Sequence, residues 1–230
     1  MAFVLHALRN NDLFVDVGAN VGTYTVLASA VVGAEVIAFE PVPSTYVELQ
    51  LNIALNGVGE RVHAHNVGLA DREGQLVMTV DQGARNQIIA NPAGFNGAEL
   101  QDVPISTLDV KVAGGRPTLL KIDVEGYETQ VLDGGMSLLQ DESTYGVIVE
   151  NNLGSDTALT PGGVFHQKML DFGFTDHTYD PFSRTLRRWS PAAANNQYDC
   201  NLLFIRDPAM VASRVQSAPR FLLRNAGLTI

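Results

Sequence analysis

The chain contains little cysteine, few basic residues and no long apolar run. Cys200 is its only cysteine, so an intramolecular disulfide framework and a cysteine-based zinc site are excluded. Lysine and arginine number 15 against 25 aspartate and glutamate residues, and the net charge is −10. A nucleic-acid partner is not expected, because neutralising a phosphate backbone requires a basic face.

The apolar stretches are also too short for a membrane protein. None reaches the roughly 18 residues of a membrane-spanning helix, and the opening of the chain is too short and too polar for a signal peptide. We therefore predict a cytoplasmic protein without a membrane partner. With 46% hydrophobic and 17% charged residues, the composition is that of a globular protein with a large core.

Predicted strands alternate with predicted helices along most of the chain. Short apolar runs predict strands at 13–17, 35–39, 62–69, 75–80, 118–123, 145–149, 174–179 and 201–206. Helical spacing predicts helices at 3–8, 23–33, 43–55, 126–139 and 163–172, with a loop at 180–199. In the helix at 43–55, Val47, Leu51, Ala54 and Leu55 share the predicted apolar face. The alternation predicts an α/β fold: an open, mostly parallel sheet with helices on both faces and an antiparallel hairpin at one edge.

One segment interrupts this regular pattern. Glycines are scattered among polar residues at 81–117, where only 103–108 looks ordered. We interpret the segment as an irregular insertion that forms a lid over the site. No linker or internal repeat divides the chain, so residues 1–230 are expected to form a single domain.

The stretch at 14–25 carries the clearest functional signal. An apolar strand ends near Asp16, a turn with Gly18 and Gly22 follows, and a helix begins, which is the order of a nucleotide-type cofactor site. A dinucleotide-binding turn would carry Gly-x-Gly-x-x-Gly, and a pyrophosphate beside Asp16 would be repelled. S-adenosylmethionine fits better, because it carries a sulfonium and an ammonium but no phosphate. Glu40 can accept both hydrogens of its ribose diol.

Four acidic residues occupy equivalent positions in the predicted sheet. Asp16, Glu40, Asp123 and Glu150 each fall at the predicted carboxyl end of a strand, so a parallel sheet gathers them around one crevice. The expected cofactor contacts are Asp16, Gly18, Asn20, Gly22, Tyr24, Thr25, Glu40, Pro41, Asn66, Val67, Gly68 and Asp123.

Several of these motifs together resemble a known family. Phe-Val-Asp-Val-Gly-Ala-Asn-Val-Gly at 14–22, Ala-Phe-Glu-Pro at 38–41, Ser-Thr-Leu-Asp at 106–109 and Leu-Lys-Ile-Asp-Val-Glu-Gly-Tyr-Glu at 120–128 are similar to the FkbM family of S-adenosylmethionine-dependent methyltransferases. The resemblance implies a class I methyltransferase fold and methylation of a hydroxyl on a sugar, a glycan or a polyketide-type natural product. It spans 13–150 and loosens downstream, and the lead-in before the first strand is shorter than is common in the family.

Methyl transfer to a hydroxyl requires positioning and a base. Asp123, Glu125 and Glu150 are the candidate bases, and Lys121 is expected to pair with a neighbouring carboxylate or to contact the substrate. An alternative is a Mg²⁺-dependent, catechol-like O-methyltransferase in which Asp123, Glu150 and Asn151 hold the metal through oxygen ligands. A second alternative is a non-catalytic binding protein on the same fold. The sequence leaves a homodimer open.

Overall fold

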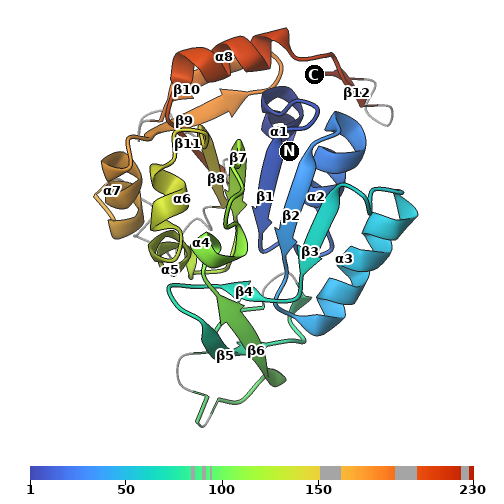
Figure 1. Cartoon of the computed structure of the whole chain (residues 1–230), viewed down its shortest axis with the longest axis vertical. Coiled ribbons are helices and arrows are strands. Elements are labelled where there is room, and N and C mark those ends of the chain that lie inside the picture. Colours follow the sequence, from blue (N-terminus) through green and yellow to red (C-terminus); the bar gives the residue numbers. More distant parts are fainter. Residues whose placement is uncertain (84–85, 90–91, 94, 151–161, 190–200, 224–227) are drawn as a thin grey trace.

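A computed structural model describes residues 1–83, 86–89, 92–93, 95–150, 162–189, 201–223 and 228–230. Its centre is an eight-stranded sheet in the order β10-β9-β11-β8-β7-β1-β2-β3 (Figure 1). The strands are β1 (Leu13–Val17), β2 (Glu35–Phe39), β3 (Val62–His65), β7 (Leu119–Ile122), β8 (Gly146–Glu150), β9 (Thr175–Asp180), β10 (Thr185–Arg188) and β11 (Asn201–Ile205).

Five neighbouring strands of this sheet, β3, β2, β1, β7 and β8, run parallel. The strands β11, β9 and β10 extend the sheet in antiparallel pairs, and the β9–β10 hairpin forms one edge. The central strands are nearly continuous apolar runs because both of their faces are covered. The prediction of an open, mostly parallel sheet with an antiparallel edge hairpin is confirmed.

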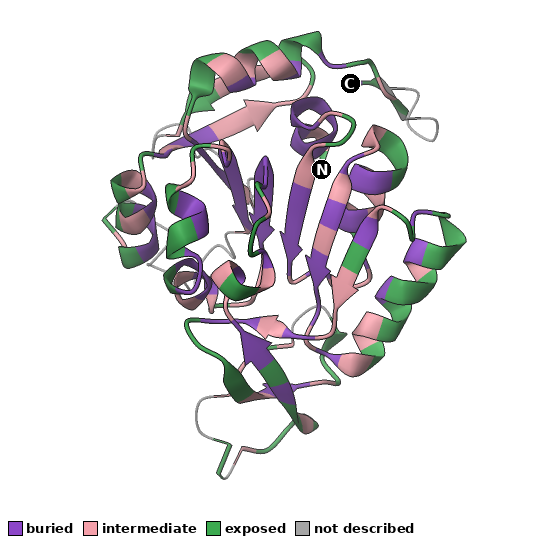
Figure 2. Ribbon diagram, viewed as in Figure 1, coloured by how far each residue is buried: buried purple, intermediate pink, exposed green. Residues whose placement is uncertain are grey.

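Helices cover both faces of the sheet, and each face has its own core (Figure 2). On one face lie α4 (Leu108–Lys111), α5 (Glu128–Asp133), α6 (Met136–Gln140) and α7 (Val164–Asp171). On the other lie α1 (Ala2–Ala7), α2 (Thr23–Val26), the π-helix η1 (Leu27–Val32), α3 (Pro43–Leu55) and α8 (Pro208–Ser217). Among the described residues no helix is long and apolar enough to cross a membrane.

A smaller sheet sits below the carboxyl ends of the central strands (Figure 1). It contains β4 (Gly68–Leu69), β6 (Leu100–Ser106) and β5 (Gly74–Thr79), in that order. The strand predicted at 62–69 is therefore two strands in two sheets. The break falls at Asn66, whose side-chain amide donates to the backbone carbonyls of Glu40 (2.8 Å) and Pro41 (3.0 Å).

Further predictions about helices and strands were also wrong or incomplete. The predicted apolar face of α3 is largely solvent-exposed: Val47 and Leu51 are 57% exposed and Leu55 is 82% exposed. Leu49 and Ile53 are buried instead, in the core that α3 shares with β2 and the edge strand β3. The loop predicted at 180–199 contains β10, and residues 190–199 lie outside the described part.

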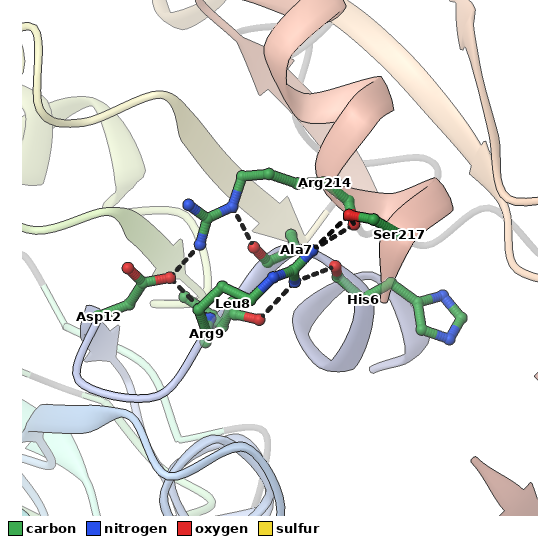
Figure 3. Close-up of polar contacts among 7 residues, drawn as sticks. All are labelled: His6, Ala7, Leu8, Arg9, Asp12, Arg214 and Ser217. Atoms are coloured by element: carbon green, nitrogen blue, oxygen red, sulfur yellow. Dashed lines mark hydrogen bonds and ion pairs between the residues drawn. The ribbon is translucent and has the colours of Figure 1, made fainter. Parts of the chain in front are cut away.

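The end of the chain had no predicted elements, yet it forms α8 and the short pair β12 (Leu222–Leu223) and β13 (Leu228–Thr229). Helix α8 is fastened to α1 by a polar cluster (Figure 3). Arg214 donates to the Ala7 carbonyl (2.8 Å) and pairs with Asp12, while Arg9 reaches the carbonyl of Arg214 and the Ser217 hydroxyl. One Asp12 oxygen also accepts the Arg9 backbone N–H at 2.7 Å. This cluster ties the last helix to the residues that lead into β1.

We expect Asp12→Ala to lower the free energy of unfolding by about 1–3 kcal/mol, because two partly buried donors lose their acceptor. The matched control is Asp71→Ala, whose ion pair with Arg72 is surface-exposed, with side chains 41% and 57% exposed. Its loss should stay below about 0.5 kcal/mol. Urea denaturation measures both. Equal losses in the two variants would contradict the role given to the α1–α8 cluster.

Candidate active site

A cavity of about 500 Å³ lies where the carboxyl ends of β1, β2, β7 and β8 meet the small sheet. The central sheet contributes Val17 to Asn20, Phe39 to Val42, Lys121, Asp123 to Glu125 and Glu150 to its wall. The small sheet and the segment after β5 contribute Met78, Gly83, Asn86, Ile88 and Ile105. Residues from distant parts of the sequence thus converge on one hollow, at the edge where α/β sheets bind ligands.

The glycine turn fits tightly between three strands. Gly18 has a φ of +75°, and a Cβ atom there would lie 1.8 Å from the backbone oxygen of Asp123. The backbone N–H groups of Gly18 and Ala19 both donate to the Phe39 carbonyl, at 3.0 and 2.9 Å. Gly22 has a φ of +90°, and a Cβ atom there would lie 2.6 Å from the Leu49 side chain of α3. Only glycine combines this backbone conformation with this closeness.

Glu40 forms one end of the cavity and is 5% exposed. Its two carboxylate oxygens accept the backbone N–H groups of Asn20 and Val42, each at 2.9 Å. Burial outweighs these hydrogen bonds and raises the pKa of Glu40 to about 7. The carboxyl group is therefore fixed in orientation, with its ionisation near neutrality.

Asp16 lies behind the cavity and does not line it. It is fully buried, and one of its oxygens accepts the Thr25 hydroxyl at 2.7 Å. The other oxygen has no hydrogen-bond partner among the described residues. Burial raises the pKa of Asp16, and the charge of Lys121, its partner across the β1–β7 pairing, acts against that shift.

Lys121 stands between Asp16 and the cavity. It is 3% exposed, its ammonium donates to Asp123 at 2.7 Å, and it lies 5.0 Å from the centre of the Tyr24 ring. Burial alone would lower the pKa of Lys121, but Asp16 and Asp123 together hold it above the ordinary value. The sequence left open whether Lys121 pairs with a carboxylate or contacts a substrate, and the structure pairs it with Asp123.

Asp123 and Glu150 meet on the cavity wall. A hydrogen bond between the two carboxyl groups raises the pKa of Glu150 to about 7, with further contributions from burial and from the charge of Asp123. Glu125 adds a smaller repulsion and has a left-handed backbone with φ of +51°. Glu150 therefore titrates near neutral pH beside Asp123, which accepts a hydrogen bond from Lys121.

The structure places the remaining predicted residues as follows. Asn20, Tyr24, Pro41, Val67 and Gly68 line the cavity, whereas Gly22, Thr25 and Asn66 support its wall from behind. Asn151 lies outside the described residues. Within the described part of the chain, no group of three His, Cys, Asp or Glu side chains could hold a metal ion.

The sequence predicted an insertion at 81–117 over the site but named no residue of the small sheet as a site residue. Met78, Asn86, Ile88 and Ile105 line the cavity. Asn86 and Ile88 lie where the sequence pattern is weak, whereas Met78 and Ile105 lie in segments that were predicted to be ordered. Ile88 packs on Val42 and Met78, and the backbone of 86–89 pairs with β5 through Thr79–Gln87 and Val77–Ile89 hydrogen bonds. The alternation of β5 was the one sequence signal that could have pointed to this wall.

Comparison with protein families gives a match to the methyltransferase FkbM domain over residues 16–180. The methyltransferase sdnD of Sordaria araneosa is 31% identical over 159 residues, covering 55% of this chain and 61% of that protein. The hexuronic acid methyltransferase AglP of Haloferax volcanii is 30% identical over 163 residues, covering 66% of this chain and 61% of that protein. The matches span about three fifths of the length of these relatives.

Similar solved structures include the C-terminal domain of precorrin-6Y C5,15-methyltransferase from Rhodobacter capsulatus, with a TM-score of 0.48 and 16% identity. That match covers 89% of this chain and 84% of the other. An rRNA methylase from Streptococcus thermophilus also gives a TM-score of 0.48, with 12% identity over 88% of this chain and 89% of the other.

We expect Gly18→Ala to lower the free energy of unfolding by about 2–4 kcal/mol, because the new methyl group overlaps the backbone oxygen of Asp123 and the residue has a positive φ. Gly59→Ala is the control, since a Cβ at Gly59 would meet nothing within 4 Å. Urea denaturation of both variants is the measurement. A Gly18→Ala protein as stable as the control would show that the turn is not packed against β7 as described.

Proposed function

The chain belongs to the FkbM methyltransferase family, and from that membership we propose that it is an S-adenosylmethionine-dependent O-methyltransferase. The observation that carries the proposal is the polarity of the cavity. Glu40 marks one end, and the pair Asp123–Glu150 marks the other. The calorimetric test is binding of S-adenosylhomocysteine, the demethylated cofactor, and absence of any binding would reject the proposal.

The residues of the cavity fit this cofactor. The apolar side chains of Val42, Met78, Ile88 and Ile105 can enclose a flat adenine, and Glu40 can accept the ribose hydroxyls. The acids Asp123, Glu125 and Glu150 suit the positive end of the molecule. Gly18 allows the cofactor to approach the backbone closely. A pyrophosphate would meet carboxylates along the same wall, so a dinucleotide fits poorly.

S-adenosylmethionine bound in this cavity would supply an electrophilic methyl carbon for the acceptor oxygen and a thioether as the leaving group. Glu150 takes the proton of the acceptor hydroxyl. A carboxylate whose pKa is about 7 is a better matched base at neutral pH than one of ordinary acidity. Lys121 donates to Asp123 at 2.7 Å and so orients the carboxyl group that hydrogen-bonds to Glu150.

The predicted magnesium site does not fit the described residues. Two carboxyl groups face each other, but Asp123 already forms an ion pair with the ammonium of Lys121. Divalent cations of this kind prefer several oxygen ligands, and Asn151 lies outside the described part. We therefore derive no step through a metal. Methyl transfer that persists in full after treatment with a chelator would agree with the metal-free assignment.

The acceptor, the location and the assembly of the protein also belong to this proposal. We propose a small-molecule or glycan hydroxyl as acceptor, which the similarity to a hexuronic acid methyltransferase supports at the level of a sugar-like ligand. We further propose one domain in the cytoplasm, with 81–117 covering the cavity through Gly83, Asn86 and Ile88. A homodimer stays an expectation that light scattering would test.

We expect Glu40→Gln to weaken binding of S-adenosylhomocysteine about ten- to a hundredfold, because hydrogen bonds to a carboxylate are lost. In the native protein, affinity should be constant above about pH 7.5 and fall as the pH drops through 7, since protonated Glu40 accepts fewer hydrogens. Calorimetry between pH 6 and 8.5 measures both effects.

The control for that experiment is Glu48→Gln, an exposed substitution on α3 that should change neither affinity nor pH profile. The affinity of Glu40→Gln should change less with pH than that of the native protein, because Glu40 no longer titrates and Glu150 alone remains as the cavity carboxyl group with a pKa of about 7. An unchanged pH dependence in Glu40→Gln would show that another group governs cofactor binding.

We expect two carboxyl groups to titrate near pH 7 in the free protein, one from Glu40 and one from Glu150. Carbon-13 NMR of labelled side-chain carboxyls detects them. Glu150→Gln should remove one of the two signals and leave affinity for S-adenosylhomocysteine within about twofold. Two neutral-range titrations in Glu150→Gln would refute the assignment of the base.

A further inference from the structure

A second, smaller cavity of about 190 Å³ adjoins the first. Its wall includes Tyr24, Ile148, Thr178, Tyr179 and Asn201. Tyr24 lines both cavities and therefore stands at their boundary. The lining comes from α1, α2, β8, β9 and β11. Figure 1 shows that β9 and β11 belong to the antiparallel side of the sheet, so the second cavity lies toward that side. The proposed cofactor contacts and the proposed base lie in the first cavity, and neither role requires the second.

The strand register connects the second cavity to the proposed base. Asn201 is the first residue of β11 and pairs directly with Glu150, the last residue of β8. Directly opposed residues of an antiparallel pair project from the same face of the sheet, with Cβ atoms about 5 Å apart. Asn201 lines the second cavity and Glu150 lines the first, so the two side chains meet where the cavities adjoin.

The side-chain carboxamide of Asn201 is available for hydrogen bonding to a ligand. Its side chain is half-buried, and it makes no hydrogen bond to another described residue. A carboxamide has two donor hydrogens and an acceptor oxygen, and partly buried polar groups normally find partners. A ligand hydroxyl in the second cavity could supply one.

We propose that the second cavity binds the methyl acceptor and that Asn201 orients the acceptor hydroxyl toward Glu150. The assignment rests on the proposed methyltransferase function. Asn201 forms no covalent bond and takes no proton, so it is a positioning residue. The hydroxyl proton goes to Glu150, and the oxygen faces the cofactor cavity across the boundary at Tyr24.

The lining indicates which acceptor chemistry fits. No side chain of Lys, Arg, His, Asp or Glu lines the cavity among the described residues. A carboxylate ligand such as a hexuronate would find no cationic side chain there. The Met1 α-ammonium lines the cavity, but burial lowers its pKa and it already donates to the Tyr24 hydroxyl at 3.2 Å. The carboxylate would also approach Glu150, at an electrostatic cost. Tyr24 and Tyr179 offer aromatic surfaces, and Thr178 and Asn201 offer polar groups. This mixture, in a space smaller than a drug-sized pocket, suits a single uncharged, hydroxyl-bearing ring.

The test uses methyl α-D-glucopyranoside as a neutral probe and methyl α-D-glucuronide as its charged counterpart. Saturation-transfer NMR measures their binding to the full chain, with and without S-adenosylhomocysteine. We expect the glucopyranoside to bind and the glucuronide to bind more weakly. Asn201→Leu should weaken glucopyranoside binding about five- to tenfold, the effect of one lost hydrogen bond, and Asn201→Gln should restore part of it.

Two further measurements separate this inference from the proposed function. Asn201→Leu should leave affinity for S-adenosylhomocysteine unchanged and, where product forms, raise the KM for the glucopyranoside more than it lowers kcat. Gln101→Leu, an exposed amide on β6, is the matched control and should change none of these values. Failure of the native protein to bind S-adenosylhomocysteine would reject the methyltransferase itself.

Three results would overturn the acceptor assignment while leaving the methyltransferase intact. These are glucopyranoside binding that Asn201→Leu does not change, glucuronide binding as strong as that of the neutral sugar, and no glucopyranoside binding to a protein that binds S-adenosylhomocysteine. A urea midpoint for Asn201→Leu equal to that of the native protein ensures that lost binding is not lost folding.

Discussion

The site depends on one buried cation. Lys121 is almost inaccessible to solvent, and it lies between two carboxylates on adjacent strands: Asp16 beside it and Asp123 at its ammonium. A buried charge is tolerated only when it is paired. Here the charge of a single lysine interacts with one carboxylate in the core and with another on the cavity wall. The hydrogen bond between Asp123 and Glu150, together with burial, raises the pKa of Glu150 to about 7.

Local sequence logic predicted most of the central site. The turn from Asp16 to Gly22 and the acids Glu40, Asp123 and Glu150 follow buried strands, and parallel strands bring their carboxyl ends to one edge. Short apolar runs bounded by glycine and proline fix such strands almost independently of the rest of the chain. The class I methyltransferase fold expected from the resemblance is confirmed for the same reason, since alternating strands and helices determine a parallel sheet.

The predictions that were wrong or absent concern packing between segments that are distant in the sequence. The apolar side of α3 looked like a core face, but how much of a helix is buried depends on the width of the sheet beneath it, and only Leu49 and Ile53 are covered. Asn201 gave no signal in the sequence, because its place beside Glu150 arises from antiparallel pairing of β11 with β8. The cavity wall from the small sheet was missed for the same reason.

The burial of Asp16 changes which carboxylates attract a cationic cofactor. From the sequence, Asp16 was to attract a cation directly, yet its carboxylate is buried behind Lys121, which offsets its charge. The negative potential of the cavity then comes from Asp123, Glu125 and Glu150, which lie on its wall. Preference for a cationic ligand over a pyrophosphate therefore survives, but it originates at the ends of β7 and β8. Asp16 acts instead by stabilising the charged form of Lys121, which in turn donates a hydrogen bond to Asp123.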